Sequence, residues 1–297
     1  MTLPEIRERN REYKLQPEGS TLRTFKEVNV MKYGIMDAML GENGERLFET
    51  AQKIGFDGLE LDCSSEDNPI WSQKGRKELK KLGILHGVEI SSICLSILKN
   101  YGLANTDTKK RDFARRLVTR AIPVAADIGA KVLLLPFFAP AAEITSEEEI
   151  SNTIKELKNC RSIAEDHGIT LGLETTLSAK KILEIVEAVN SNYVKVYYDV
   201  GNAVGLGYDP AKELRELGSK IAQVHIKDKV IRGEKVVTCK FLGEGNVDFV
   251  SVKKALKEIR YEGYLILELP VPPFNATDDL PKIAARNLEY LKKLMKM

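Results

Sequence analysis

The sequence lacks the features that mark several common classes of protein. Its four cysteines are widely spaced and form no CxxC pair, so neither a zinc cage nor a dense disulfide framework is expected. The first residues, MTLPEIRERNREYK, are charged where a signal peptide needs an apolar segment. No later stretch approaches the roughly 18 uncharged apolar residues of a membrane helix. We therefore predict a cytoplasmic protein with reduced thiols and no membrane partner.

An excess of charge of either sign is also missing. The 297 residues include 45 basic and 43 acidic side chains, a formal net charge of +2. The net charge is too small to attract a polyanion, so we predict no nucleic-acid partner and expect a small-molecule ligand instead. The length is close to the ~250 residues typical of a (β/α)8 barrel, which makes one large domain the simplest expectation.

The hydrophobic pattern divides the chain into an arm and a barrel. Residues 1–30 lack a sustained apolar period, and we predict an N-terminal arm there. In residues 31–297, short β-type runs alternate with long amphipathic segments, the pattern of a parallel sheet built from βα units. Eight such units favour an α/β fold of the closed (β/α)8 TIM barrel type over an open sheet. The predicted strands are 32–36, 58–62, 90–95, 131–136, 170–174, 195–199, 221–226 and 264–269.

Local signals add detail to this barrel. Ser146 with Glu149 predicts a capping box at a helix start, and His167-Gly168 predicts a helix end. Residues 229–245 carry two short β-prone runs around Arg232-Gly233, which predicts a hairpin inserted after strand seven. We expect this hairpin to overhang the top face of the barrel.

Four successive strands end in a polar residue. Strands five to eight close with Glu174, Asp199, His225 and Glu268 respectively. In a (β/α)8 barrel the active site lies at these C-terminal strand ends, and neighbouring strands are only about 4.8 Å apart. Three carboxylates that meet there without compensation would raise one another's pKa values, and a divalent cation removes the conflict. Oxygen ligands with one imidazole suit Mn²⁺, Mg²⁺ or Co²⁺.

Several longer motifs resemble a known family. GFDGLEL, HGITLGLE, YYDVGN, HIKD and GYLILEL are similar to segments of the sugar phosphate isomerase/epimerase superfamily, the xylose isomerase-like TIM barrels. The resemblance runs from about residue 31 to the C-terminus and is greatest to the ketose 3-epimerases related to D-tagatose 3-epimerase. It implies a homodimer or homotetramer that acts on a sugar or sugar phosphate, with Mn²⁺ as the first choice of cofactor.

The resemblance also implies a mechanism. The residues that match Glu174, Asp199, His225 and Glu268 bind the metal in that family, and the two glutamates face opposite sides of the substrate. One glutamate removes the proton at C3 of a ketose, the metal stabilises the resulting cis-enediolate, and the other glutamate returns a proton to the opposite face. The expected result is inversion at C3.

Substrate contacts are predicted at five further residues. Asn202 stands where the free-sugar epimerases carry a histidine, and DVGN is similar to the pentulose-5-phosphate 3-epimerases. On that branch, Lys227 or Arg232 would meet a phosphate as a charge-assisted donor. Glu60 and Ser96 complete the predicted substrate-binding set. The ketose is therefore expected to be free or 5-phosphorylated.

Other functions remain open at this point. An aldose-ketose isomerase of the hydroxypyruvate or hexulose-phosphate type would use the same four ligands, and a keto-inositol dehydratase is also compatible. A three-metal apurinic endonuclease would need more than the three histidines present. A barrel that only binds a sugar and a metal would not need two opposed glutamates.

Overall fold

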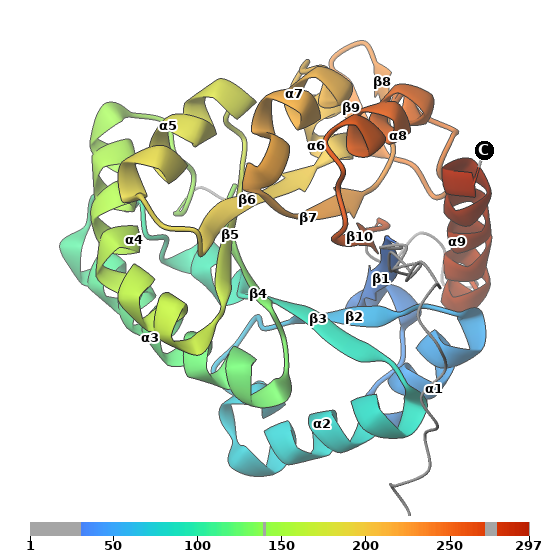
Figure 1. Ribbon diagram of the computed structural model, residues 1–297, viewed down its shortest axis with the longest axis horizontal. Coiled ribbons are helices and arrows are strands. Elements are labelled where there is room, and N and C mark those ends of the chain that lie inside the picture. Colours follow the sequence, from blue (N-terminus) through green and yellow to red (C-terminus); the bar gives the residue numbers. More distant parts are fainter. Residues whose placement is uncertain (1–30, 139–140, 271–277, 297) are drawn as a thin grey trace, which may run out of the picture. The chain divides into compact units, whose positions relative to one another are not determined.

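The barrel is closed by eight parallel strands. The computed structural model describes residues 31–138, 141–270 and 278–296, so the predicted arm at residues 1–30 lies outside the described residues. The strands are β1 (Lys32–Met36), β2 (Gly58–Asp62), β3 (Glu89–Cys94), β4 (Val132–Phe137), β5 (Thr170–Thr175), β6 (Val194–Asp199), β7 (Ile221–Ile226) and β10 (Tyr264–Leu267). Their order around the barrel is β1-β10-β7-β6-β5-β4-β3-β2, which confirms the predicted TIM barrel (Figure 1).

Helices surround the strands and cover their outer faces (Figure 1). Glycines in the left-handed conformation end several of them, and Gly168 follows His167 as predicted, with φ of 65°. The predicted capping box of Ser146 and Glu149 is also confirmed. The helices are α1 (Gly44–Ile54), α2 (Gln73–His86), α3 (Thr108–Ile128), α4 (Glu147–His167), α5 (Ala179–Val189), α6 (Val200–Gly205), α7 (Pro210–Leu217), α8 (Phe249–Glu258) and α9 (Leu280–Lys296), with short 3-10 helices η1 (Asp37–Leu40), η2 (Pro69–Trp71), η3 (Ser96–Asn100) and η4 (Gly218–Lys220).

Each strand presents one face to the helices and one to the barrel interior. Leu59, Leu133 and Leu171 are fully buried in the large core between the strands and the helices. A second, smaller core fills the barrel itself and includes Cys94 and Tyr197. Both faces of the strands are therefore covered, which explains their nearly continuous apolar sequences.

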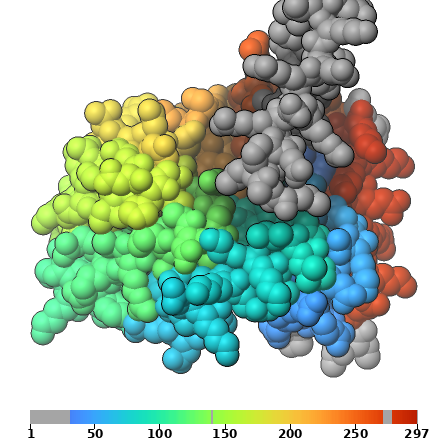
Figure 2. Space-filling view, turned by 60° about the horizontal axis from the view of Figure 1, so that its bottom comes forward, coloured from blue at the N-terminus to red at the C-terminus, as the bar shows by residue number. Residues whose placement is uncertain are grey.

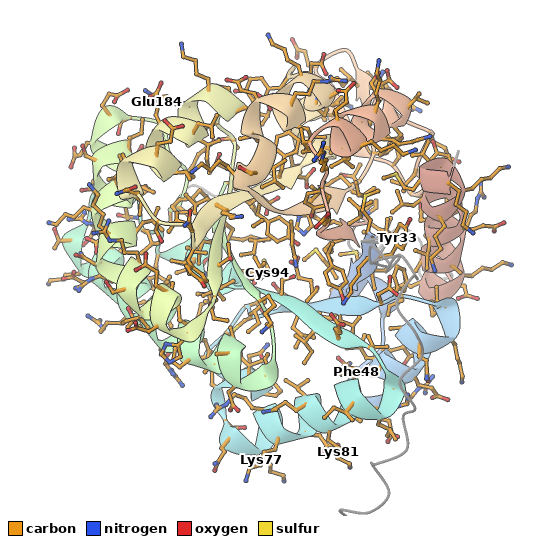
Figure 3. All side chains as sticks on the ribbon, viewed as in Figure 1. Tyr33, Phe48, Lys77, Lys81, Cys94 and Glu184 are labelled. Carbon is orange, nitrogen blue, oxygen red and sulfur yellow. The ribbon has the colours of Figure 1, made fainter. Side chains whose placement is uncertain are left out.

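The outer surface is polar by contrast. Cys94 lies toward the barrel interior, whereas the exposed Lys77, Lys81 and Glu184 point outward from α2 and α5 (Figure 3). In the space-filling view, the helices of the first half of the chain, coloured blue to green, form a closely packed outer surface (Figure 2). Within the described ranges, no helix combines the length and the hydropathy that crossing a bilayer would require.

The hairpin predicted after strand seven is confirmed. Strands β8 (Lys229–Arg232) and β9 (Lys235–Thr238) pair in antiparallel fashion and turn at Gly233, whose φ is 59°. The loop that follows is tied down by Asp228, which is 1% exposed. Its Oδ1 accepts the backbone N–H groups of residues 229 and 247, and its Oδ2 accepts those of residues 243 and 245. A Cβ at Gly245 would lie 2.3 Å from Asp228 Oδ1, so only glycine fits there.

We expect Asp228→Asn to lower the free energy of unfolding by about 2–4 kcal/mol, because either orientation of the amide leaves two buried N–H groups facing an NH₂ group. Urea denaturation measures the loss. Asp209→Asn is the matched control, since Asp209 caps α7 through one backbone N–H and asparagine caps equally well, within about 0.5 kcal/mol. Equal stability of the two variants would contradict this role of Asp228.

Candidate metal centre

The four predicted ligands meet at the C-terminal end of the barrel. Strands β5, β6, β7 and β10 are consecutive neighbours in the barrel, and Asp199 pairs directly with His225 in the β6–β7 register. Glu174 lies near the end of β5, and Glu268 immediately follows β10. One potential ligand atom from each residue lies within 4.8 Å of the other three.

His225 is at the middle of this group. Its Nδ1 lies 3.0 Å from Glu268 Oε2, 3.5 Å from Glu174 Oε1 and 3.7 Å from Asp199 Oδ2. The residue is 1% exposed, and Glu174 and Asp199 are 3% and 5% exposed. Charged groups are costly to bury at such low exposure unless they are paired.

The donor set fits a divalent cation. Among the described residues, Asp199 Oδ2 and His225 Nδ1 are buried without a hydrogen-bond partner, and both are turned toward the centre of the group. Three carboxylates and one imidazole suit a hard or borderline divalent ion, and thiolates are absent from the set. Binding of such an ion would satisfy His225 Nδ1 and would add to the ion pair that Asp199 Oδ2 makes with Lys227, so ligation by the four residues remains our prediction.

Asn202 lies against two of the four residues. Its backbone N–H donates to Asp199 Oδ1 at 2.7 Å, and its side-chain Nδ2 donates to Glu174 Oε1 at 3.2 Å. Lys229 then donates from Nζ to Asn202 Oδ1 at 2.7 Å. Sequence reasoning missed Lys229, although the alternation of His225, Lys227 and Lys229 along one extended segment could have indicated a shared side.

Three other residues predicted to contact the substrate lie in three different parts of the barrel. Ser96 begins η3 and is 7% exposed, and its hydroxyl has no hydrogen-bond partner among residues 31–138, 141–270 and 278–296. Arg232 lies exposed at the end of β8. Glu60 is fully buried inside the barrel, where its Oε1 lies 2.8 Å from His225 Nε2.

The remaining histidines lie on the helices. His86 is the last residue of α2, and its Nδ1 lies 3.2 Å from Gln52 Oε1. His167 is the last residue of α4, and its Nδ1 lies 2.9 Å from the carbonyl oxygen of Ile163. An imidazolium is favourable at a helix C-terminus.

The chain was also compared with known proteins. Residues 48–294 match the family model described as xylose isomerase-like TIM barrel. The chain belongs to this family. It is 28% identical over 234 residues to L-ribulose-5-phosphate 3-epimerase UlaE of Escherichia coli (strain SMS-3-5 / SECEC), a match that covers 76% of this chain and 81% of the relative. The predicted superfamily is thereby confirmed.

Solved structures have the same fold. The structure of L-ribulose 3-epimerase superposes with a TM-score of 0.75 at 19% identity, covering 90% of this chain and 95% of that one. The IOLI protein with a bound zinc atom superposes with a TM-score of 0.73 at 20% identity, covering 90% and 98%. At these identities the likeness establishes the fold alone.

In this xylose isomerase-like barrel, Lys227 contributes a positive charge to the acidic centre. Its Nζ lies 2.7 Å from Glu268 Oε1 and 3.0 Å from Asp199 Oδ2, and its side chain is 8% exposed. Burial lowers the pKa of Lys227, but Asp199 and Glu268 outweigh burial and raise it above its usual range. Its ammonium therefore stays charged and partly balances the carboxylates.

The carboxylates respond to burial and to Lys227 in different ways. Burial raises the pKa of Asp199 to about 6, with Lys227 opposing the shift and Glu268 adding to it. Burial also raises the pKa of Glu268, but Lys227 and His225 outweigh burial and hold that pKa well below its usual range. Carboxylates this close influence one another's protonation, so a cation at the centre would favour the ionised form of all three.

We expect Lys227→Met to lower the free energy of unfolding of the metal-free protein by about 3 kcal/mol, because removal of one partner leaves buried charges unpaired. Urea denaturation in EDTA near neutral pH measures the loss. The control is Lys32→Met, which removes an exposed ion pair with Glu89 and should have little effect. A Lys227→Met protein as stable as the control would show that Lys227 does not balance the acidic centre.

Proposed function

We propose that the chain is a divalent-metal-dependent ketose 3-epimerase that inverts C3 of a free or 5-phosphorylated ketose. The observation that carries the proposal is the placement of Glu174 and Glu268 at the C-terminal ends of the first and last of four consecutive strands, with Asp199 and His225 between them. Two carboxylates that flank one site suit a reaction in which a proton leaves one face and returns to the other. The 3-epimerase name of the relative UlaE supports the same reaction.

The chemistry requires a strong positive charge beside the base. A hydrogen next to a carbonyl group is too weakly acidic for a carboxylate unless the developing oxyanion is stabilised. Glu174, Asp199, His225 and Glu268 would hold a divalent cation, with Mn²⁺ our first choice and Co²⁺ or Mg²⁺ as alternatives. When bound, the ion supplies polarisation of the carbonyl oxygen.

Two of the four residues would carry protons and two would mainly bind the metal. One of Glu174 and Glu268, as the carboxylate, takes the proton from C3, which leaves a cis-enediolate, and the other, which starts as the carboxylic acid, donates its proton to the opposite face. Proton exchange with water then returns both glutamates to their starting forms. Besides His225, each glutamate has a second polar partner that helps to fix its position, since Asn202 donates to Glu174 and Lys227 contacts Glu268. Asp199 and His225 serve mainly as ligands.

We propose contacts for the sugar at the residues predicted from the sequence. Ser96, whose hydroxyl has no hydrogen-bond partner among the described residues, and Asn202, which donates to Glu174, would contact the substrate hydroxyls. A 5-phosphate would meet Arg232 or Lys227, and Arg232 is the better donor because Lys227 already balances two carboxylates. These contacts and the predicted homodimer or homotetramer are proposals.

Deuterium exchange separates the proposal from an aldose-ketose isomerase. The metal-loaded protein is incubated in D₂O with a panel of ketoses and ketose 5-phosphates, and the products are read by NMR. We expect deuterium at C3 together with the C3 epimer. Exchange confined to C1 would support the isomerase, and binding without any exchange would support a sugar-binding barrel.

We expect Glu174→Gln and Glu268→Gln each to lower kcat by about 10³-fold or more, since each removes a proton carrier. Metal affinity, followed by calorimetry, should fall much less, because the amide oxygen remains a ligand. The control is Glu213→Gln, which changes a buried carboxylate on α7 that accepts the N–H of Ala179 and the hydroxyl of Tyr198. Retained turnover in both active-site variants would refute the assigned roles.

A further inference from the structure

Glu60 is a carboxylate buried inside the barrel beneath the candidate metal centre. It belongs to β2 and is 0% exposed, while His225 on β7 is 1% exposed. Glu60 Oε1 lies 2.8 Å from His225 Nε2, although the two residues are 165 positions apart in the sequence. A carboxylate without any exposure must satisfy both of its oxygens within the protein.

The two oxygens of Glu60 have different partners. Oε2 accepts the hydroxyl of Ser92 at 2.7 Å and that of Tyr197 at 2.6 Å. Oε1 is left for His225 Nε2. Ser92 and Tyr197 come from β3 and β6, so two other strands hold the carboxylate that β2 carries. This arrangement fixes which oxygen faces the imidazole.

The contact decides how His225 presents its ring. An imidazole that binds a metal is neutral and carries one N–H, and an Nε2–H donated to Glu60 leaves the lone pair on Nδ1 for the ion. Nδ1 is the nitrogen that lies 3.0 Å from Glu268 Oε2 and has no hydrogen-bond partner among the described residues. The ring of Tyr197 packs against the imidazole with centroids 4.5 Å apart and limits its rotation.

We propose that Glu60 is a positioning residue that acts through His225 and sets the tautomer and orientation in which His225 meets the metal. This role replaces the substrate contact predicted from the sequence, because a fully buried carboxylate inside the barrel does not reach a sugar above it. The inference rests on the proposed metal site. In metal sites generally, loss of a carboxylate that accepts a hydrogen bond from a ligating histidine lowers metal affinity or activity by about 10–100-fold.

The test compares Mn²⁺ affinities by calorimetry in the full-length chain. Glu60→Gln keeps the shape of the side chain, but its neutral amide accepts more weakly from Nε2–H, and its NH₂ group can instead favour the wrong tautomer. We expect the dissociation constant for Mn²⁺ to rise by about 10–100-fold. Glu213→Gln is the matched control, since it also changes a buried carboxylate that accepts a tyrosine hydroxyl, and its Mn²⁺ affinity should match that of the wild type.

A second measurement needs no variant. The chain has three histidines, so their ring nitrogens can be resolved by NMR after ¹⁵N-histidine labelling. In protein loaded with diamagnetic Zn²⁺, we expect His225 to carry its proton on Nε2 and the metal on Nδ1. In Glu60→Gln we expect the Nε2 proton to exchange faster with water.

Each outcome decides the inference. Weaker binding in Glu60→Gln, with the control unchanged and both proteins equally folded by circular dichroism, supports it. If the wild type binds Mn²⁺ and Glu60→Gln binds it with the same affinity, the inference is overturned and the proposed function stands. If the wild type binds no Mn²⁺, the proposed function fails and the inference fails with it. Should Glu60→Gln not fold, the wild-type spectrum decides, and a protonated Nδ1 in the Zn²⁺-loaded protein overturns the inference.

Discussion

The charge at one point of the barrel constrains the rest of the site. Glu174, Asp199 and Glu268 bring three carboxylates to within 4.8 Å of the His225 ring nitrogen, and of the three only Glu268 is more than 5% exposed. Like charges repel strongly there, and desolvation adds to the cost. The arrangement is stable only if positive charge is supplied, and Lys227 supplies part of it. A divalent cation supplies more and gives the centre its chemistry.

The barrel provides the rigid frame that such a centre needs. Apolar side chains fill the interior below the centre, and the helices cover the outer faces of the strands. The polar residues inside are few and connected, since Glu60 links Ser92, Tyr197 and His225 in one hydrogen-bonded group. Buried polar networks of this kind are costly when incomplete and restrict side chains to one geometry when complete. The position of His225 is therefore set by Glu60 and its partners inside the barrel, below the predicted metal site.

Much of this organisation could be predicted from the sequence. The predicted bounds of β1, β2 and β7 match the structure, and those of the other barrel strands differ by one or two residues, because apolar runs closed by a polar residue are a strong local signal. The hairpin was predictable for the same reason, from two β-prone runs around a glycine turn. The alignment of Glu174, Asp199, His225 and Glu268 followed once the strands were placed in order around the barrel.

The contacts across the barrel could not be predicted in this way. Glu60 lies in the apolar run GLEL, and its meeting with His225 depends on the direction of two side chains that are far apart in sequence. Lys229 was missed because its contact with Asn202 depends on the path of the inserted hairpin. Periodicity shows which face of a strand is inward, whereas the partner across the interior depends on register and packing.

The central claim is that one divalent cation is shared by the four residues. Anomalous diffraction at the manganese edge, on crystals grown with Mn²⁺, tests it directly. The account predicts one strong peak among the four residues, within bonding distance of Glu174, Asp199, Glu268 and His225 Nδ1. A crystal grown at saturating Mn²⁺ in which the ion is bound only elsewhere, with no peak among the four residues, would contradict the account.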